Sequence, residues 1–95
     1  MGALTGCTSQ QITPNVSRKI IEVVTPATAD SNDTLDVSDA TVTGGQILSG
    51  IYGVLGAYDT TTGDAVTATW STTTITLDAA GGTTNHVYRV LVYGY

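Results

Sequence analysis

The sequence predicts an all-β protein: a small antiparallel β-sandwich or jelly-roll-like barrel of six to seven strands with an extended N-terminal arm. Three observations lead to this prediction. Threonine, a β-branched residue that suits a pleated surface, supplies 19 of the 95 residues, and only 12% of the residues are charged. Short apolar runs recur along the chain and are separated by turn-forming glycine, proline and aspartate. No stretch favours a helix longer than one turn.

The chain divides into a polar N-terminal segment, residues 1–16, and one β-sandwich domain, residues 17–95. The first segment is made of small and polar residues with Pro14 near its end, so we expect it to form an extended arm outside the core. A chain of this length buries only about 60–65% of its unfolded surface, which is enough for a single modest core.

Three predicted strands are apolar on both of their alternating faces: Lys19–Thr25, Ile47–Tyr58 and His86–Tyr95. A strand of this kind is covered on both sides. We therefore expect His86–Tyr95 to be a central strand, with its last residues in contact with another subunit.

Glycine recurs at every third position of the segment ILSGIYGVLGAY, at Gly50, Gly53 and Gly56. Three glycines would cost a helix about 2–3 kcal/mol relative to alanine. The segment is therefore expected to form a bent or bulged strand. Its glycines fit either a core strand or the close approach of a neighbouring subunit.

Two other strands, Val66–Trp70 and Ile75–Leu77, alternate apolar residues with threonine, serine and aspartate. This alternation predicts an antiparallel pair with one face in solvent. Trp70 is the expected anchor of the core, surrounded by Val66, Leu77, Val90 and Val92.

The charge balance disfavours several classes of partner. The net charge is −5, and Arg18, Lys19 and Arg89 are the only basic residues. Nucleic acids and anionic membranes are bound by clustered lysine and arginine, so neither is an expected partner. A chain with so little charge suits a protein that lives in an assembly.

The sequence contains no expected catalytic constellation and implies no cofactor. His86 is the only histidine and is expected at the surface, and Cys7 is the only cysteine and lies in the predicted arm. Nucleophilic catalysis needs a base beside the nucleophile. We therefore expect the protein not to be an enzyme.

Four aspartates crowd one loop and the strand after it: Asp30, Asp33, Asp36 and Asp39. Calcium binds six to eight oxygens, several of them from carboxylates, so a calcium site is one interpretation. The spacing does not match an EF-hand loop, and aspartate also forms turns through its own side chain. Turn chemistry is the favoured interpretation.

Two motifs carry a resemblance to a known class of proteins: KIIEVVTPATADSNDTLDV, which begins at Lys19, and GGTTNHVYRVLVYGY, which ends at Tyr95. From Lys19 onward the chain resembles small virion proteins that tailed phages encode near their capsid genes. The resemblance implies a decoration or cement protein with a β-sandwich fold, located in the virion. It implies no catalytic residue.

The expected partners are other copies of this chain, with a trimer favoured, and the major capsid protein. The expected contact residues are Gly2, Ala3, Leu4, Ile12, Val16, Tyr52, Tyr93 and Tyr95. One alternative is a subunit of a tail tube or extracellular filament whose arm completes a neighbour's sheet. A second alternative is a carbohydrate-binding β-sandwich that stacks sugars on Trp70, Tyr52, Tyr58, Tyr93 and Tyr95.

Overall fold

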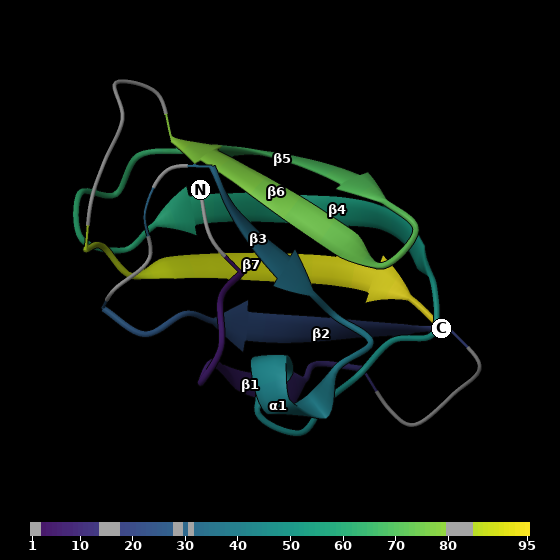
Figure 1. Cartoon of the computed structure of the whole chain (residues 1–95). Coiled ribbons are helices and arrows are strands. Elements are labelled where there is room, and N and C mark those ends of the chain that lie inside the picture. Colours follow the sequence, from purple (N-terminus) through teal and green to yellow (C-terminus); the bar gives the residue numbers. More distant parts are fainter. Residues whose placement is uncertain (1–2, 14–17, 28–29, 31, 80–84) are drawn as a thin grey trace.

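The computed structural model is a sandwich of two antiparallel β-sheets and describes residues 3–13, 18–27, 30, 32–79 and 85–95 (Figure 1). One sheet has four strands in the order β1-β2-β7-β4: Thr8–Gln11, Lys19–Val24, Tyr88–Gly94 and Ile51–Asp59. The other has three strands in the order β3-β6-β5: Asp33–Asp36, Thr74–Ala79 and Val66–Ser71. The predicted all-β sandwich is confirmed.

The short helix α1, Ala40–Thr43, is a single turn. Asp39 caps its N-terminus by accepting a hydrogen bond from the Thr41 amide, and Gly44 ends it in the left-handed conformation. Within the described part of the chain, no helix is long and apolar enough to cross a membrane.

Strand β7 lies at the centre of the four-stranded sheet, between β2 and β4. Its residue Val90 pairs with Val23 on one side and with Ala57 on the other. The inward-facing residues Tyr88, Val90 and Val92 are fully buried. The prediction of a central strand from the VLVYGY segment is therefore confirmed.

The core lies between the inner faces of the two sheets. The predicted core residues Val66, Leu77, Val90 and Val92 are all buried. Other fully buried side chains come from β2, β3, β6 and the segments before and after α1: Ile21, Val23, Leu35, Val37, Leu48 and Ile75. Burying one side chain of this size contributes about 1.5–3 kcal/mol to folding.

Trp70 is not the core anchor that the sequence predicts, because 43% of its surface is exposed. Its alternation with Val66 and Ala68 was predicted correctly, and Val66 is buried. However, β5 is an edge strand and Trp70 stands at its far end, next to the turn into β6. The sandwich therefore covers the ring only in part.

Two β-bulges in β4 explain the three-residue glycine period of its sequence. The residues of β4 that face the core are Ile51, Val54 and Ala57, three positions apart instead of the usual two. The extra residues of the bulges, Tyr52 and Leu55, are 49% and 58% exposed. The bulged strand favoured by the sequence is confirmed.

Residues 3–13, the described part of the N-terminal segment, are built into the sandwich, whereas the sequence predicts an arm outside the core. The Leu4 amide donates to the carbonyl oxygen of Thr34 at 2.8 Å, and the Cys7 amide donates to Val42 at 3.0 Å. Leu4 and Cys7 are buried, and β1 then pairs with β2. β1 has the polar sequence TSQQ. As an edge strand it is held by backbone hydrogen bonds to β2, which do not require apolar side chains and so give no apolar pattern in the sequence.

Candidate functional site

The face of the four-stranded sheet that points away from the core is called the outer face here. The described chain contains two sheets and α1, which contacts β3, so no third layer of described residues covers this face. The strand register places three rows of side chains across it. In order from β1 through β2 to β7, the rows are Ile12, Ile20 and Tyr93; Gln10, Glu22 and Leu91; and Thr8, Val24 and Arg89. The bulged strand β4 adds Tyr52, Leu55 and Tyr58.

Three tyrosines form an aromatic cluster at one end of the outer face. The ring centroid of Tyr52 lies 5.3 Å from that of Tyr93 and 5.2 Å from that of Tyr95, and both ring pairs are tilted. The guanidinium of Arg18 lies 5.1 Å from the Tyr52 centroid, a cation–π distance. A hydrogen bond with Tyr93 helps to raise the pKa of Arg18 above its ordinary value. The cluster is a cationic and aromatic surface.

A second arginine, Arg89, lies on the outer face in the row of Thr8 and Val24, away from the aromatic cluster. Nη1 of Arg89 donates to the hydroxyl oxygen of Tyr58 at 3.1 Å, and its Nε lies 3.8 Å from Oε1 of Glu22. The hydrogen bond with Tyr58 is the main cause of a raised Arg89 pKa. These contacts hold the guanidinium beside the side chains of Tyr58 and Glu22.

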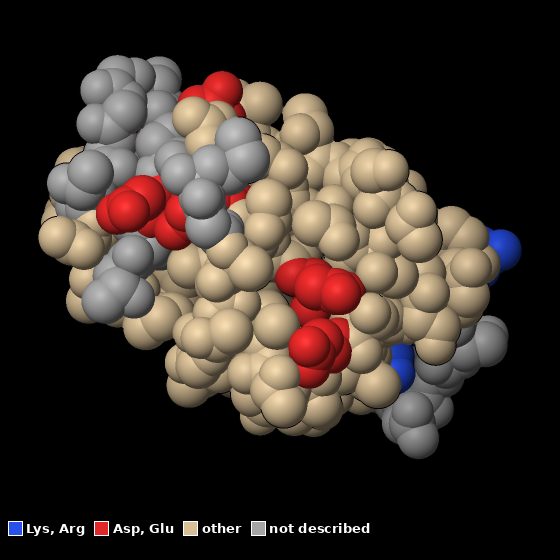
Figure 2. All heavy atoms as spheres, in the orientation of Figure 1, with Lys and Arg blue, Asp and Glu red and all other residues tan. Residues whose placement is uncertain are grey.

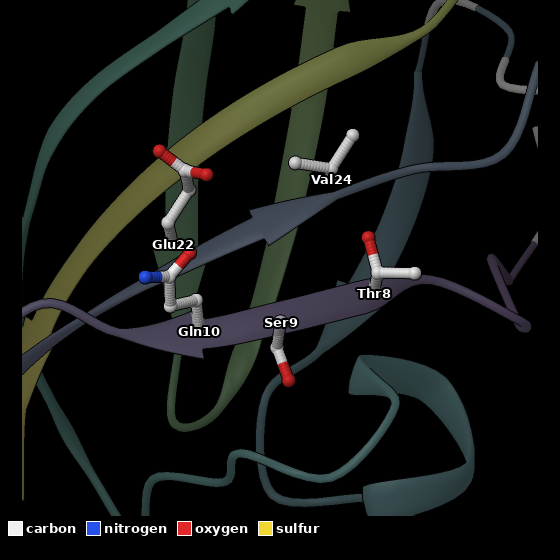
Figure 3. Close-up of a pocket in the computed structure, with 5 residues that line it drawn as sticks. All are labelled: Thr8, Ser9, Gln10, Glu22 and Val24. Carbon is white, nitrogen blue, oxygen red and sulfur yellow. The ribbon is translucent and has the colours of Figure 1, made fainter.

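A shallow hollow of about 170 Å³ continues the outer face over β1 and β2. Thr8, Gln10, Glu22 and Val24 project into it (Figure 3). Ser9 points to the other side of the sheet, where its hydroxyl oxygen accepts a hydrogen bond from the backbone amide of residue 46. Most side chains around this hollow are therefore polar, while the β4–β7 side of the outer face is mainly aromatic and aliphatic.

The opposite surface of the molecule has a different chemistry. The outward residues of the three-stranded sheet, within its described side chains, carry hydroxyls and carboxylates: Thr34, Asp36, Thr67, Thr69, Ser71, Thr74, Thr76 and Asp78. In Figure 2 this surface shows acidic groups, and basic groups appear only at the rim. The half-exposed pair predicted from the sequence is confirmed, and the molecule has two unlike faces.

Four glycines in or beside β4 and β7 fall into two kinds. A Cβ on Gly94 would overlap the carbonyl oxygen of Gly50, and a Cβ on Gly50 would overlap the ring of Tyr95. In contrast, a Cβ on Gly53 or Gly56 would meet nothing within 4 Å, and neither residue has a positive φ. The fold of this chain therefore requires glycine at position 94, where the obstacle is backbone, but not at positions 53 and 56. At position 50 the half-exposed ring of Tyr95 would have to move.

The four aspartates considered as calcium ligands make turn and cap contacts. Oδ2 of Asp33 accepts from the Asp30 amide at 2.8 Å, and Oδ1 of Asp36 accepts from the amide and hydroxyl of Ser38. The Ser38 hydroxyl is the main cause of a lowered Asp36 pKa. Asp39 caps α1. In the described ranges no three His, Cys, Asp or Glu side chains form a group that could hold a metal ion.

A hydrogen bond between the buried Asp59 and the part-buried His86 was not anticipated from the sequence. Nδ1 of His86 lies 2.5 Å from Oδ2 of Asp59, whose side chain is only 2% exposed, and the Thr61 amide donates to Oδ1. Burial raises the pKa of Asp59, but hydrogen bonds from His86 and the loop amides outweigh it, so the pKa lies below its ordinary value. Asp59 continues the inward alternation of Ala57, and a carboxylate at a buried position needs a partner. The alternation of inward positions along β4 was the signal in the sequence that could have indicated a partner for Asp59.

The contact residues predicted from the sequence are divided between the outer face and the core. Four lie on or beside the outer face: Ile12, Tyr52, Tyr93 and Tyr95. Leu4 is only 5% exposed and belongs to the core, and Ala3 bridges to Thr34 of the other sheet. Gly2 and Val16 lie outside the described residues.

Comparison with models of known protein families, with curated protein sequences and with solved structures finds no match to this chain. The function is therefore argued from the geometry of the outer face and from the sequence.

Proposed function

We propose that this chain is a structural subunit of a phage particle, a capsid decoration or cement protein that binds neighbouring subunits and stabilises the shell. One observation carries the proposal: the aromatic and aliphatic outer face has no covering layer in the described chain. Contiguous apolar patches on small proteins mark interaction sites. Within an assembly, neighbouring subunits would cover this face.

The composition of the outer face supports a protein partner. Tyrosine and arginine are enriched among the residues that contribute most to protein–protein binding. Here Tyr52, Tyr93 and Tyr95 lie within one cluster, with Arg18 over the Tyr52 ring. Tilted ring pairs and the cation–π contact fix these side chains before binding, which lowers the entropy cost of forming an interface.

The sequence resemblance supports the virion setting. Its most distinctive segment, VLVYGY, forms most of β7 and the residue that follows it. The residues of this segment that point away from the core are Leu91, Tyr93 and Tyr95. They belong to the outer face or its aromatic cluster. The segment that resembles virion proteins is therefore also the segment that supplies the contact surface.

Co-sedimentation of the full chain with capsid shells from the same genome tests the proposal. We expect saturable binding of the folded protein to intact shells. Tyr52→Ser should weaken this binding, because it removes the ring that contacts both other tyrosines. Thr76→Ser on the opposite face is the matched control and should bind as the unchanged protein does. Folded protein that stays in the supernatant at saturating concentration would rule out the decoration role.

A second candidate function is carbohydrate binding. It is favoured by the position of the aromatic cluster on the same face as the hollow that Gln10 and Glu22 line. Sugars commonly stack on aromatic rings while amide and carboxylate groups bind their hydroxyls. Trp70 is on the other sheet and would not join this site. Saturable binding of neutral glycans, lost in Tyr52→Ser, would support this function in place of shell binding.

The alternative of a filament built by donor-strand exchange has less structural support. The strand that would be donated, β1, already pairs with β2 of its own chain, and Leu4 and Cys7 are buried beside it. The other edge strand, β4, carries two bulges, and bulges hinder edge-to-edge pairing. Contacts through a sheet face are therefore favoured over contacts through a sheet edge.

A further inference from the structure

We propose that two copies of this chain associate outer face to outer face about a two-fold axis, with β4 packed against β4 of the other copy. The inference goes beyond the proposed function, because it names another copy of the chain as the partner of the outer face. Tyr52 and Leu55 of each copy would fill the space beside Gly53 and Gly56 of the other. The contact would form a dimer, in place of the trimer favoured by the sequence.

The distribution of exposed apolar side chains identifies a second copy as the occupant. Among the described residues, six large hydrophobic side chains are exposed, and four of them lie on or beside the outer face: Ile12, Tyr52, Leu55 and Tyr95. The described outward side chains of the three-stranded sheet are hydroxylated or acidic. The surface of another copy that best matches an apolar face is therefore the same face, and a face that binds itself gives a two-fold dimer.

The size of the molecule sets the scale of such a contact. It measures 37 × 22 × 21 Å along its principal axes. A standard protein interface takes roughly 800 Å² from each partner. The dimer contact would therefore need nearly the whole side of the molecule that carries the outer face.

The bulges of β4 make the outer face self-complementary. Each bulge sets a large exposed residue beside a glycine, Tyr52 beside Gly53 and Leu55 beside Gly56. The space above both glycines is empty within this chain, as shown by the absence of any atom within 4 Å of a Cβ placed there. Glycine weakens a strand unless a backbone or ligand must approach closely. A second β4 strand running across the first would bring its large residues into this space.

The charges of the outer face allow the same contact. Arg18 and Arg89 are positive and Glu22 is negative, so the face carries both signs and little net charge. The contact should therefore depend mainly on apolar burial, which salt does not weaken. A contact between the outer face and the acidic face of another copy would instead weaken with salt.

Sedimentation velocity on the full chain tests the inference. We expect a dimer that forms with increasing concentration between about 1 and about 200 µM and persists from about 0.05 to about 0.5 M NaCl. Gly56→Val fills one of the empty spaces and should weaken dimerisation roughly tenfold or more while the melting temperature is kept. Leu55→Ser should act in the same way through loss of the inserted side chain. Thr69→Val places the same valine on the opposite face and is the matched control.

A wild-type chain that stays monomeric at the highest concentration would overturn the inference, as would a trimer or a dimer that dissociates in high salt. Dimerisation that Thr69→Val weakens, and that Gly56→Val and Leu55→Ser leave intact, would place the interface on the opposite face and would also overturn it. This test is distinct from the test of shell binding. A chain that stays monomeric but still co-sediments with shells keeps the decoration role and rules out the dimer. A dimer that binds no shell supports the dimer and rules out the decoration role.

Discussion

The imidazole of His86 reaches the end of β4 and places Nδ1 2.5 Å from Oδ2 of the buried Asp59. The hydrogen bonds around Asp59 hold its pKa below the ordinary value despite burial. The stability from this carboxylate is therefore complete above the unfolded pKa of about 3.9 and is lost as the pH falls through the folded pKa. We expect the melting temperature to fall as the solution is acidified below about pH 4.

Asp59→Asn isolates this contribution from those of the other aspartates. It should lower the free energy of unfolding at pH 7 by about 1–3 kcal/mol, because a charged buried hydrogen bond is replaced. The gap in melting temperature between this variant and the unchanged protein should close as the pH falls. A gap of the same size at pH 7 and at about pH 3 would show that the charge of Asp59 does not contribute to stability.

Substitution of alanine for Gly94 and for Gly53, one glycine of each kind, should have different effects on the free energy of unfolding. Gly94→Ala forces a Cβ into the carbonyl oxygen of Gly50 and should cost about 1–3 kcal/mol or more of unfolding free energy. Gly53→Ala meets nothing and should be neutral, or stabilising by about 0.5–1 kcal/mol. Urea unfolding of both variants at low protein concentration checks this. Equal destabilisation by both would mean that β4 does not follow the register described.

The thiol of Cys7 reports on the position of the N-terminal segment. Cys7 is 4% exposed, and burial raises its pKa to about 11. Thiolates are the reactive form, so the native protein should react slowly with a thiol reagent at pH 8, and unfolding should speed the reaction. Rapid reaction of the folded protein would place the N-terminal segment outside the core.

Trp70 provides a spectroscopic check on the edge strand β5. Because its surface is 43% exposed, its fluorescence should be quenched by acrylamide in the native state and should shift little on unfolding. Trp70→Phe should cost less than about 1 kcal/mol, whereas loss of a fully buried tryptophan costs about 3–5 kcal/mol. A native emission shifted strongly to the blue would show that the ring is covered.

Alternation of apolar residues was enough to predict most of the sandwich from the sequence. It predicted which residues of β5 and β6 face the core, and it predicted the central position of β7. Each face of a buried strand must meet an apolar layer. It failed for β1, whose edge position relies on backbone pairing to β2. It also gave the correct face for Trp70 but not its exposure, since strand order decides how far each residue is covered.

The candidate site could be predicted only in part for the same reason. Tyr52, Tyr93 and Ile12 were expected to contact a partner, but their assembly on one face depends on which strands are neighbours. The bulges shift the phase of β4, so simple alternation does not indicate that Tyr52 and Leu55 share a face. The Asp59–His86 pair joins residues 27 positions apart and also depends on strand pairing.

The central position of β7 has a consequence for biosynthesis. β7 joins β2 to β4, and residues 88–94 are translated after the other strands of the described residues. The four-stranded sheet therefore cannot close while these residues are still inside the ribosome. Until they emerge, β2 and β4 each present an unpaired edge, and such edges favour aggregation. Until β7 emerges, a nascent chain of this protein should thus depend on chaperones more than a protein whose central strand is made early.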